Sequence, residues 1–417
     1  MSRRMVLWGS TLLSGSVMDQ TGLTTWQMYR SLALSIYLPA LLMSFCQSSI
    51  LLAIPLFALD LGGSVSIAAL VFSLRGLGNM AADVPAGYGV SRLGDKFIML
   101  VGIGMMAVMG IASSQAQSAL QLAGAAFFFG CAMAIWLVAR ITHISTFVAD
   151  HQRGKAISTM AGLQRFGNLM GPIVSGIVAH QFGFQWVFVL VSIIACIAFV
   201  LIVVFVPEKK QQHSSAKPGL LRIVPHIFMG HSRTFLTAGM AIFCLSILRA
   251  SRQLLIPLWA NAIGLNASEI GLITGIAAGV DMAMFPLAGY MMDNWGRKHA
   301  AVSSMGVIAL ALVMLPWTSS FLTLCLFAML AGVGNGLGAG INVVLGSDFA
   351  AEHERGEFLG VWRLMGDTGS FSAPVLVGLA TQTLYLGGVF PLMACFGVVG
   401  VFIVVLFVEE PLLRRDR

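Results

Sequence analysis

Apolar runs of about 20 residues recur along the whole chain and are separated by short polar stretches. A helix of that length crosses the roughly 30 Å hydrocarbon layer of a bilayer. Backbone amides in lipid must be satisfied within their own segment, so the runs are expected to be helices and not strands. The pattern predicts twelve spanning helices, at 32–59, 65–88, 97–115, 119–149, 155–180, 184–206, 234–262, 268–291, 300–319, 321–350, 357–382 and 388–408.

Four local features of the sequence recur at one constant spacing. The segment GYGVSRLGDK begins at Gly87, and the similar segment GYMMDNWGRK begins 202 residues later, at Gly289. The same spacing relates Arg153-Gly154 to Arg355-Gly356, Pro55-Leu56 to Pro257-Leu258, and Pro172 to Pro374. Four landmarks in one register predict two parallel repeats of six helices, an arrangement typical of transporters with a central site.

The composition is that of a chain whose solvent is mostly lipid. Hydrophobic residues make up 58% of the chain and charged residues only 10%, against about a quarter charged in soluble proteins. The polar linker 207–233 separates two bundles, 31–206 and 234–408, which are flanked by an N-terminal segment 1–30 and a tail 409–417. The predicted fold class is an all-α membrane protein with two pseudo-symmetric six-helix bundles.

The distribution of positive charge predicts the orientation of the chain. Eighteen Lys and Arg residues lie in the terminal segments, the linker and the even-numbered gaps between helices, and none lies in the odd-numbered gaps. Positive charge marks the cytoplasmic side, so both termini and the linker are predicted to be cytoplasmic, in the cell (inner) membrane. The net charge of +7 therefore indicates orientation and contact with anionic lipid headgroups, and no nucleic-acid partner is expected.

The repeated loop segments resemble the loop motif of the major facilitator superfamily, G-x-L-a-D-R-x-G-R-[RK]. The second copy matches it at Gly289, Asp293, Gly296, Arg297 and Lys298. The first copy matches it at Gly87, Arg92 and Gly94, but has Ser91 and Asp95 where the family has aspartate and arginine. The resemblance covers residues 30–410. It implies the fold of that family, with an intact charge lock at the cytoplasmic gate only in the C-terminal half.

A second motif lies in the fifth predicted helix. It consists of Gly167, Gly171, Pro172, Ser175 and Gly176 in the pattern G-x3-G-P-x2-S-G. It resembles the antiporter motif G-x3-G-P-x2-G-G of the drug:proton exporters of the same superfamily. Small residues at this spacing are also common wherever membrane helices pack closely. In combination with the loop motif and the repeat, the pattern favours an antiporter.

Six arginines and four aspartates lie within the predicted helices. A charge at bilayer depth costs about 3 kcal/mol or more unless it is paired or hydrated, so each one is a candidate for function. The arginines are Arg75, Arg140, Arg165, Arg249, Arg252 and Arg363, and the acids are Asp83, Asp281, Asp348 and Asp367. Of these, Asp83, Arg140 and Asp348 lie near the predicted cytoplasmic ends, from which they could reach the headgroups.

Some of these charges are expected to meet across the interface between the two halves. In the fold of the family, helix two faces helix eleven and helix five faces helix eight. That arrangement would bring Arg75 toward Asp367 and Arg165 toward Asp281, with the cations in the N-terminal half and the anions in the C-terminal half. A local pair between Arg363 and Asp367, four residues apart on one helix, is the alternative. Asp281 and Asp367 are the candidate proton carriers.

Two pairs of basic residues suggest a substrate with an anionic group. Arg249 and Arg252 share one face of helix seven, and Arg140 and His143 share one face of helix four; both helices line the central cavity in the family. Because guanidinium groups bind planar oxyanions through two hydrogen bonds, a carboxylate, phosphate or sulfonate is the expected ligand. The alternative is a structural role, in which Arg249 or Arg252 binds backbone carbonyls.

These observations favour a secondary active transporter, in particular a proton-coupled exporter of a small organic solute that acts as a monomer. A carrier of an anionic metabolite is the alternative within transport, and a non-transporting membrane sensor or membrane-embedded enzyme is the alternative from another class. The chain has no ATP-binding G-x-x-x-x-G-K-[ST] segment and no H-E-x-x-H metal site. No enzymatic activity, cofactor or metal is therefore expected, and the coupling is expected to come from an ion gradient.

Overall fold

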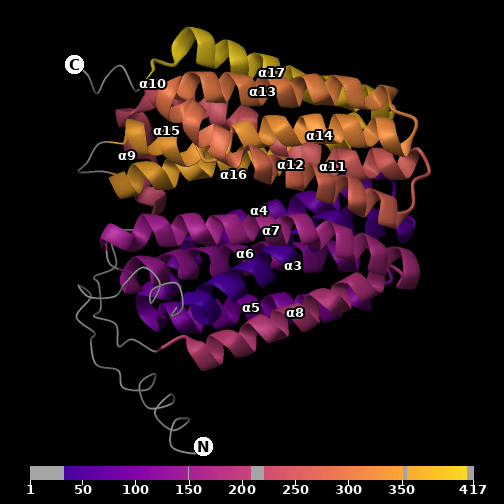
Figure 1. Ribbon diagram of the computed structural model, residues 1–417, viewed down its shortest axis with the longest axis horizontal. Coiled ribbons are helices and arrows are strands. Elements are labelled where there is room, and N and C mark those ends of the chain that lie inside the picture. Colours follow the sequence, from indigo (N-terminus) through magenta and orange to yellow (C-terminus); the bar gives the residue numbers. More distant parts are fainter. Residues whose placement is uncertain (1–31, 149, 208–219, 351–354, 411–417) are drawn as a thin grey trace, which may run out of the picture.

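The computed structural model describes residues 32–148, 150–207, 220–350 and 355–410, and in these ranges the chain forms helices and no strand (Figure 1). The N-terminal half contains η1 (Ala33–Tyr37), α3 (Leu38–Asp60), α4 (Val65–Leu93), α5 (Asp95–Ser114), α6 (Ala119–Phe147), α7 (Asp150–Phe182) and α8 (Phe184–Phe205). Two short helices, α9 (Leu220–Gly230) and α10 (Ser232–Thr234), connect the halves. The C-terminal half contains η2 (Phe235–Gly239), α11 (Met240–Ala262), α12 (Ala267–Asn294), α13 (Arg297–Met314), η3 (Leu315–Trp317), α14 (Phe321–Leu337), α15 (Ile341–Phe349), α16 (Arg355–Ala380) and α17 (Leu386–Phe407).

The predicted fold class is confirmed by this architecture. The described helices combine into twelve long segments, and ten of these contain an 18-residue window apolar enough to cross a membrane. The other two segments are α7 and α16, whose polar and charged residues lower their hydropathy. The segment 1–30, most of the linker, the loop 351–354 and the tail from residue 411 lie outside the described residues.

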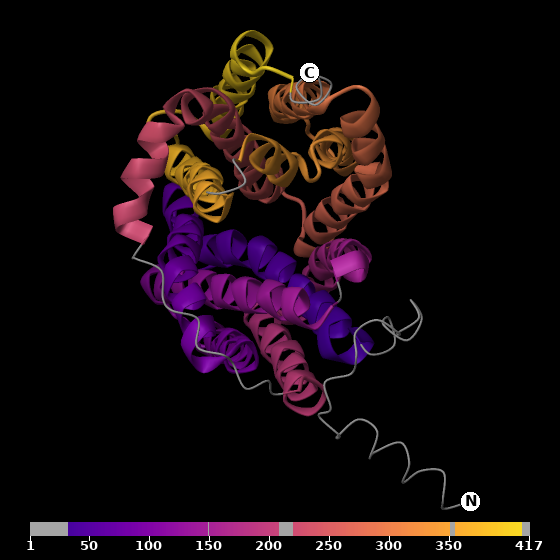
Figure 2. The same cartoon turned by 90° about the vertical axis from the view of Figure 1, so that its left-hand side faces the viewer.

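The two halves pack as separate bundles that use the same helix pairings. In the N-terminal bundle α3 packs on α7, α4 on α6 and α5 on α8; in the C-terminal bundle their counterparts α11 and α16, α12 and α14, and α13 and α17 do the same. Figures 1 and 2 show the bundles side by side, one indigo to magenta and one orange to yellow. They meet along two seams, α7 against α12 and α4 against α16, with a smaller contact between α3 and α11.

Two glycines of the loop motifs make the sharp turns between successive helices. Gly94, between α4 and α5, has φ +94°, and Gly296, between α12 and α13, has φ +100°. This left-handed backbone is unfavourable for residues with a Cβ atom. The other two motif glycines, Gly87 and Gly289, lie inside α4 and α12, where a Cβ atom would meet nothing within 4 Å.

The glycines of the second motif allow α7 to pack closely against two different helices. Gly167 and Gly171 face α3, where an added Cβ atom would collide with the backbone near Phe45. Gly176 faces α12, and its Cβ atom would lie 2.5 Å from the carbonyl oxygen of Ala267 and 2.8 Å from Cα of Gly271. The motif therefore joins α7 to its own bundle through two glycines and to the other bundle through the third.

The Gly176 contact lies at the end of the molecule opposite the linker, which we call the far end; the end at which α8 stops and α9 begins is the linker end. At the far end the other seam is also closed, because Ser66 on α4 donates a hydrogen bond to the carbonyl oxygen of Gly378 on α16. The bundles are thus in direct contact at the far end along both seams.

Replacing Gly176 with alanine tests this close contact. At a helix position with free space, replacing Gly with Ala raises the free energy of unfolding by about 1 kcal/mol. Where the added methyl group has no space, the substitution lowers the free energy of unfolding by about 1–3 kcal/mol. We expect Gly176→Ala to lower the melting temperature of the detergent-purified protein. The control is Gly162→Ala on the same helix, where the Cβ atom meets nothing within 4 Å, and its melting temperature should equal or exceed that of the wild type. Equal melting temperatures for the two variants would contradict the close contact.

Candidate functional site

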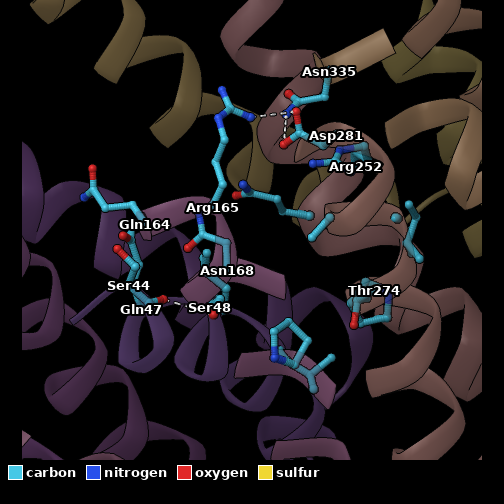
Figure 3. Close-up of a pocket in the computed structure, with 18 of the residues that line it drawn as sticks. Ser44, Gln47, Ser48, Gln164, Arg165, Asn168, Arg252, Thr274, Asp281 and Asn335 are labelled. Atoms are coloured by element: carbon cyan, nitrogen blue, oxygen red, sulfur yellow. Dashed lines mark hydrogen bonds and ion pairs between the residues drawn. The ribbon is translucent and has the colours of Figure 1, made fainter. Parts of the chain in front are cut away.

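A cavity of about 410 Å³ lies between the two bundles (Figure 3). Five helices from both halves contribute its walls: α3, α7, α11, α12 and α14. Its lining residues are Ser44, Gln47, Ser48, Leu51, Leu52, Ala161, Gln164, Arg165, Asn168, Pro172, Arg252, Gln253, Ile256, Pro257, Thr274, Ala277, Ala278, Asp281 and Asn335. Because residues from both repeats line it, any movement of one bundle against the other changes its shape.

The lining of the cavity is rich in polar side chains. Amide side chains form the largest polar group: Gln47, Gln164, Asn168, Gln253 and Asn335. Three lining residues carry formal charges, Arg165, Arg252 and Asp281, and no lining residue in the described part of the chain is aromatic. Such walls can satisfy the hydrogen bonds of a polar solute, which a purely apolar pocket cannot do.

An ion pair crosses between the bundles at the wall of the cavity. Arg165 Nη1 on α7 lies 3.1 Å from Oδ1 of Asp281 on α12, and the second carboxylate oxygen accepts a 2.9 Å hydrogen bond from Nδ2 of Asn335 on α14. The guanidinium also lies 4.5 Å from the centre of the Phe285 ring. Both charged side chains are largely buried, with exposed fractions of 20% and 17%. Figure 3 shows Arg165 reaching from the N-terminal bundle toward Asp281 and Asn335.

The two arginines of α11 have different environments. Nη2 of Arg249 donates a 2.7 Å hydrogen bond to the carbonyl oxygen of Gly338, and Arg249 does not line the cavity. This is the structural role that the sequence left as an alternative. Arg252 lines the cavity, and it makes no hydrogen bond or ion pair with any described residue. The expected basic face of this helix therefore contributes one arginine to the cavity and not two.

Arg140 and His143 lie outside the cavity. Arg140 is 3% exposed and lies behind the cavity wall, where the amide oxygen of Gln164 accepts hydrogen bonds from both of its Nη atoms. Nδ1 of His143 lies 2.6 Å from Oδ2 of Asp95, at the start of α5. The four basic residues grouped by the sequence thus do not form one binding surface, because the two on α6 point into the N-terminal bundle.

The α4–α16 seam carries a charge cluster that differs from the sequence expectation. Nη2 of Arg363 lies 2.8 Å from Oδ1 of Asp83, and Nε of the same side chain lies 3.4 Å from Oδ2 of Asp367. Across this seam the acid comes from the N-terminal half and the cation from the C-terminal half, opposite to the expected polarity. Arg75 makes no ion pair with Asp367 among the described residues, although it is close enough to act on it electrostatically. Asp83, which from its position in the sequence could have reached the headgroups, pairs instead with Arg363 of the other bundle.

In both halves the loop motif contributes one residue to a buried side-chain pair, and these two motif residues are 202 positions apart. In the second copy Nε of Arg297 lies 2.9 Å from Oδ2 of Asp348, and Glu410 accepts hydrogen bonds from the backbone amides of Arg297 and Lys298. In the first copy Asp95 occupies the position of Arg297 and pairs with His143 instead. The N-terminal half therefore has its own buried side-chain pair at this position, in which the motif residue is the acid and not the base.

Two other motif residues have simpler environments. Arg92 lies 5.2 Å from the ring centre of Tyr88, in its own helix. Asp293, which the sequence places in the C-terminal lock, is exposed and makes no contact with a charged or hydrogen-bonding group among the described residues. The pair between Arg297 and Asp348 is therefore the ionic contact of this motif.

Removing Asp348 tests that pair. Breaking a buried ion pair on one side leaves an uncompensated charge and costs about 3 kcal/mol, whereas an exposed substitution stays within about 0.5 kcal/mol. We expect Asp348→Asn to lower the free energy of unfolding by about 3 kcal/mol, and Asp293→Asn, on the exposed side of the same motif, to leave it unchanged. Thermal or denaturant unfolding of the two variants in matched detergent measures the difference, and equal effects would contradict the assignment.

Comparison with known proteins finds one family model and several similar proteins. The family model of the Major Facilitator Superfamily matches residues 36–250 and 238–417. The multidrug resistance protein MdtG of Salmonella choleraesuis (strain SC-B67) is 24% identical over 271 residues, which are 64% of this chain and 67% of the relative. MdtL of Salmonella paratyphi C (strain RKS4594) is 20% identical over 345 residues, 81% of this chain and 86% of the relative.

Solved structures share the fold at low sequence identity. A POT family transporter in complex with 5-aminolevulinic acid superposes with a TM-score of 0.73 at 12% identity, covering 93% of this chain and 96% of its own. A D-xylose–proton symporter superposes with a TM-score of 0.69 at 16% identity, covering 92% of this chain and 98% of its own. At these identities the likeness extends to the arrangement of helices and not to the site.

Proposed function

The chain belongs to the major facilitator superfamily of transporters, and from that premise we propose that it is a secondary active transporter that exports a small organic solute in exchange for protons. The bundles would rock about the central cavity, so that it opens to one side of the membrane at a time. The relatives named as multidrug resistance proteins support export. Since all walls of the cavity come from one chain, a monomer is sufficient for this function.

The proposed orientation places the linker end in the cytoplasm. The eighteen basic residues in the terminal segments, linker and even-numbered gaps support it, because the bacterial inner membrane retains positive loops on that side. The far end, where the Gly176 contact and the Ser66 hydrogen bond join the bundles, would then face outward. In this conformation the protein would be closed to the outside.

The observation that carries the proposal is the ion pair between Arg165 and Asp281. It joins the two bundles and also borders the cavity, so it responds to both bundle movement and cavity contents. A proton on Asp281 would remove the negative charge, weaken the pair and release Arg165 for the solute. Proton binding, solute binding and closure of the α7–α12 seam would thereby be linked at one site.

Replacing Asp281 with asparagine tests this linkage. The amide side chain keeps the shape and can still accept hydrogen bonds, but it cannot carry a proton. We expect Asp281→Asn to lose accumulation of solute against its gradient while retaining solute counterflow, both measured in proteoliposomes. The control is Asp60→Asn, an exposed acid at the end of α3, which should behave like the wild type. Accumulation by Asp281→Asn at the wild-type level would reject Asp281 as the proton carrier.

A carrier of an anionic metabolite is the second candidate function, and Arg252 is the observation that favours it. Its guanidinium borders the cavity without a partner among the described residues, and a charge in that position is costly unless a ligand or water satisfies it. With Arg165 and Asp281 forming a pair, Arg252 leaves the polar lining with one excess positive charge. A carboxylate or phosphate group of the solute would neutralise it.

Substitution of Arg252 tests the anionic substrate. Lysine keeps the charge but loses the forked hydrogen bonds, so Arg252→Lys should weaken the binding of a carboxylate or phosphate substrate by about 1–3 kcal/mol. Arg249→Lys is the matched variant on the same helix and should lower thermal stability with little change in substrate affinity, because Arg249 binds a backbone carbonyl. Proteoliposome transport screened over organic acids and over neutral and cationic dyes gives the affinities. A cationic dye transported best, with affinity unchanged in Arg252→Gln, would exclude the anionic substrate.

A further inference from the structure

The α4–α16 seam contains two carboxyl groups on one edge of a single guanidinium. Nη2 of Arg363 binds Asp83 from the N-terminal bundle, and Nε binds Asp367 from its own helix. These two nitrogens form the edge that ordinarily binds both oxygens of one carboxylate, with two nearly parallel hydrogen bonds. Here that edge binds one oxygen from each of two carboxyl groups, so the geometry of the guanidinium brings the two acids together.

The carboxyl groups of Asp83 and Asp367 are consequently within hydrogen-bonding reach of each other. Two ionised carboxylates at that separation repel strongly, and a hydrogen bond between them requires a proton. The charged groups that act on either acid from the described residues are Arg363, on the same helix as Asp367, and Arg75, on the same helix as Asp83. Arg75 makes no ion pair with them, so the shared edge of Arg363 is the direct ionic contact of both acids.

We propose that Asp83 and Asp367 share one proton and form a proton-binding site that joins the bundles at the α4–α16 seam. The site is separate from the central cavity, since neither acid nor Arg363 lines it. The side chains of Asp83 and Asp367 are 20% and 25% exposed, which allows water to exchange the proton. The inference rests on the proposed function only in assuming that the bundles move against each other.

Separation of the seam would release the proton. Arg363 and Asp367 lie four residues apart on α16, so their contact survives when α4 moves away. Asp83 would then face water alone, where an aspartate is ionised at neutral pH. The docked state binds one more proton than the separated state. The population of the docked state is therefore expected to increase on acidification. The equilibrium ratio of docked to separated protein can rise by up to tenfold for each pH unit.

A distance measurement across the seam tests the proposal on the full chain. Spin labels at Tyr88 on α4 and Gly356 on α16, both exposed, report whether the helices are docked. In wild-type background the short-distance population should increase as the pH is lowered. In Asp83→Asn and in Asp367→Asn this dependence should be lost, because an amide can bridge the remaining acid and Arg363 without a proton. Asp60→Asn, an exposed acid outside the seam, should retain the wild-type dependence.

Infrared difference spectroscopy gives a second readout that does not need the labels. The wild-type protein should show a protonated-carboxyl band that disappears at high pH and is missing in either seam variant. A wild-type distance distribution that does not change with pH, or a dependence equal in the wild type and both seam variants, would overturn the proposal. Loss of coupled transport in Asp281→Asn with an intact pH response at the seam would support both sites separately. An intact transport cycle with no pH response would reject this site alone.

Discussion

A charged side chain at membrane depth needs a partner, a ligand or water, and this constraint organises the molecule. The alternative for each charge is a cost of about 3 kcal/mol or more in the bilayer interior. Among the described residues, Asp281 has Arg165, Asp83 and Asp367 share Arg363, and Asp348 has Arg297. The Arg165–Asp281 pair and the cluster of Asp83, Asp367 and Arg363 each connect the two bundles. The interactions that offset the cost of burying these charges therefore also stabilise the two seams. Any movement of the bundles must exchange these partners for water, protons or solute.

The two seams are related by the internal repeat but differ in chemistry. Arg165 on α7 and Asp367 on α16 occupy equivalent positions, 202 residues apart, yet they have opposite charge. At the α7–α12 seam the N-terminal bundle supplies the cation, whereas at the α4–α16 seam it supplies the acid. The duplicated scaffold thus has one seam next to the polar cavity and one outside it. Under the two proposals, the first seam responds to both solute and protons, and the second seam responds to protons alone.

The loop motifs show the same divergence at the linker end. Asp95 and Arg297 are also repeat equivalents, and each forms a buried pair with a residue of the following long helical segment, His143 or Asp348. The flanking lysines keep identical roles: Lys96 and Lys298 donate hydrogen bonds to the carbonyl oxygens of Val203 and Val405, which are again 202 residues apart. What the two halves share at this position is a buried side-chain pair that joins the motif residue to the following helical segment, with the acidic partner on opposite sides.

The sequence by itself was sufficient for the helices, the repeat and the charges that form the seams, whereas the partners of those charges were decided by the tertiary structure. Lipid permits only internally bonded helices, so run length predicts them directly, and a charge inside an apolar run is conspicuous. Arg and Asp side chains, however, reach several helices from one position. Arg249 donates a hydrogen bond to a backbone carbonyl, whereas Arg252 lines the cavity. Asp83 forms an ion pair with Arg363 of the other bundle. The spacing of residues along the sequence predicts how deep in the membrane a side chain lies and on which face of its helix. Whether two charges form an ion pair depends on the distance between their helices, and only the packing of the helices determines that distance.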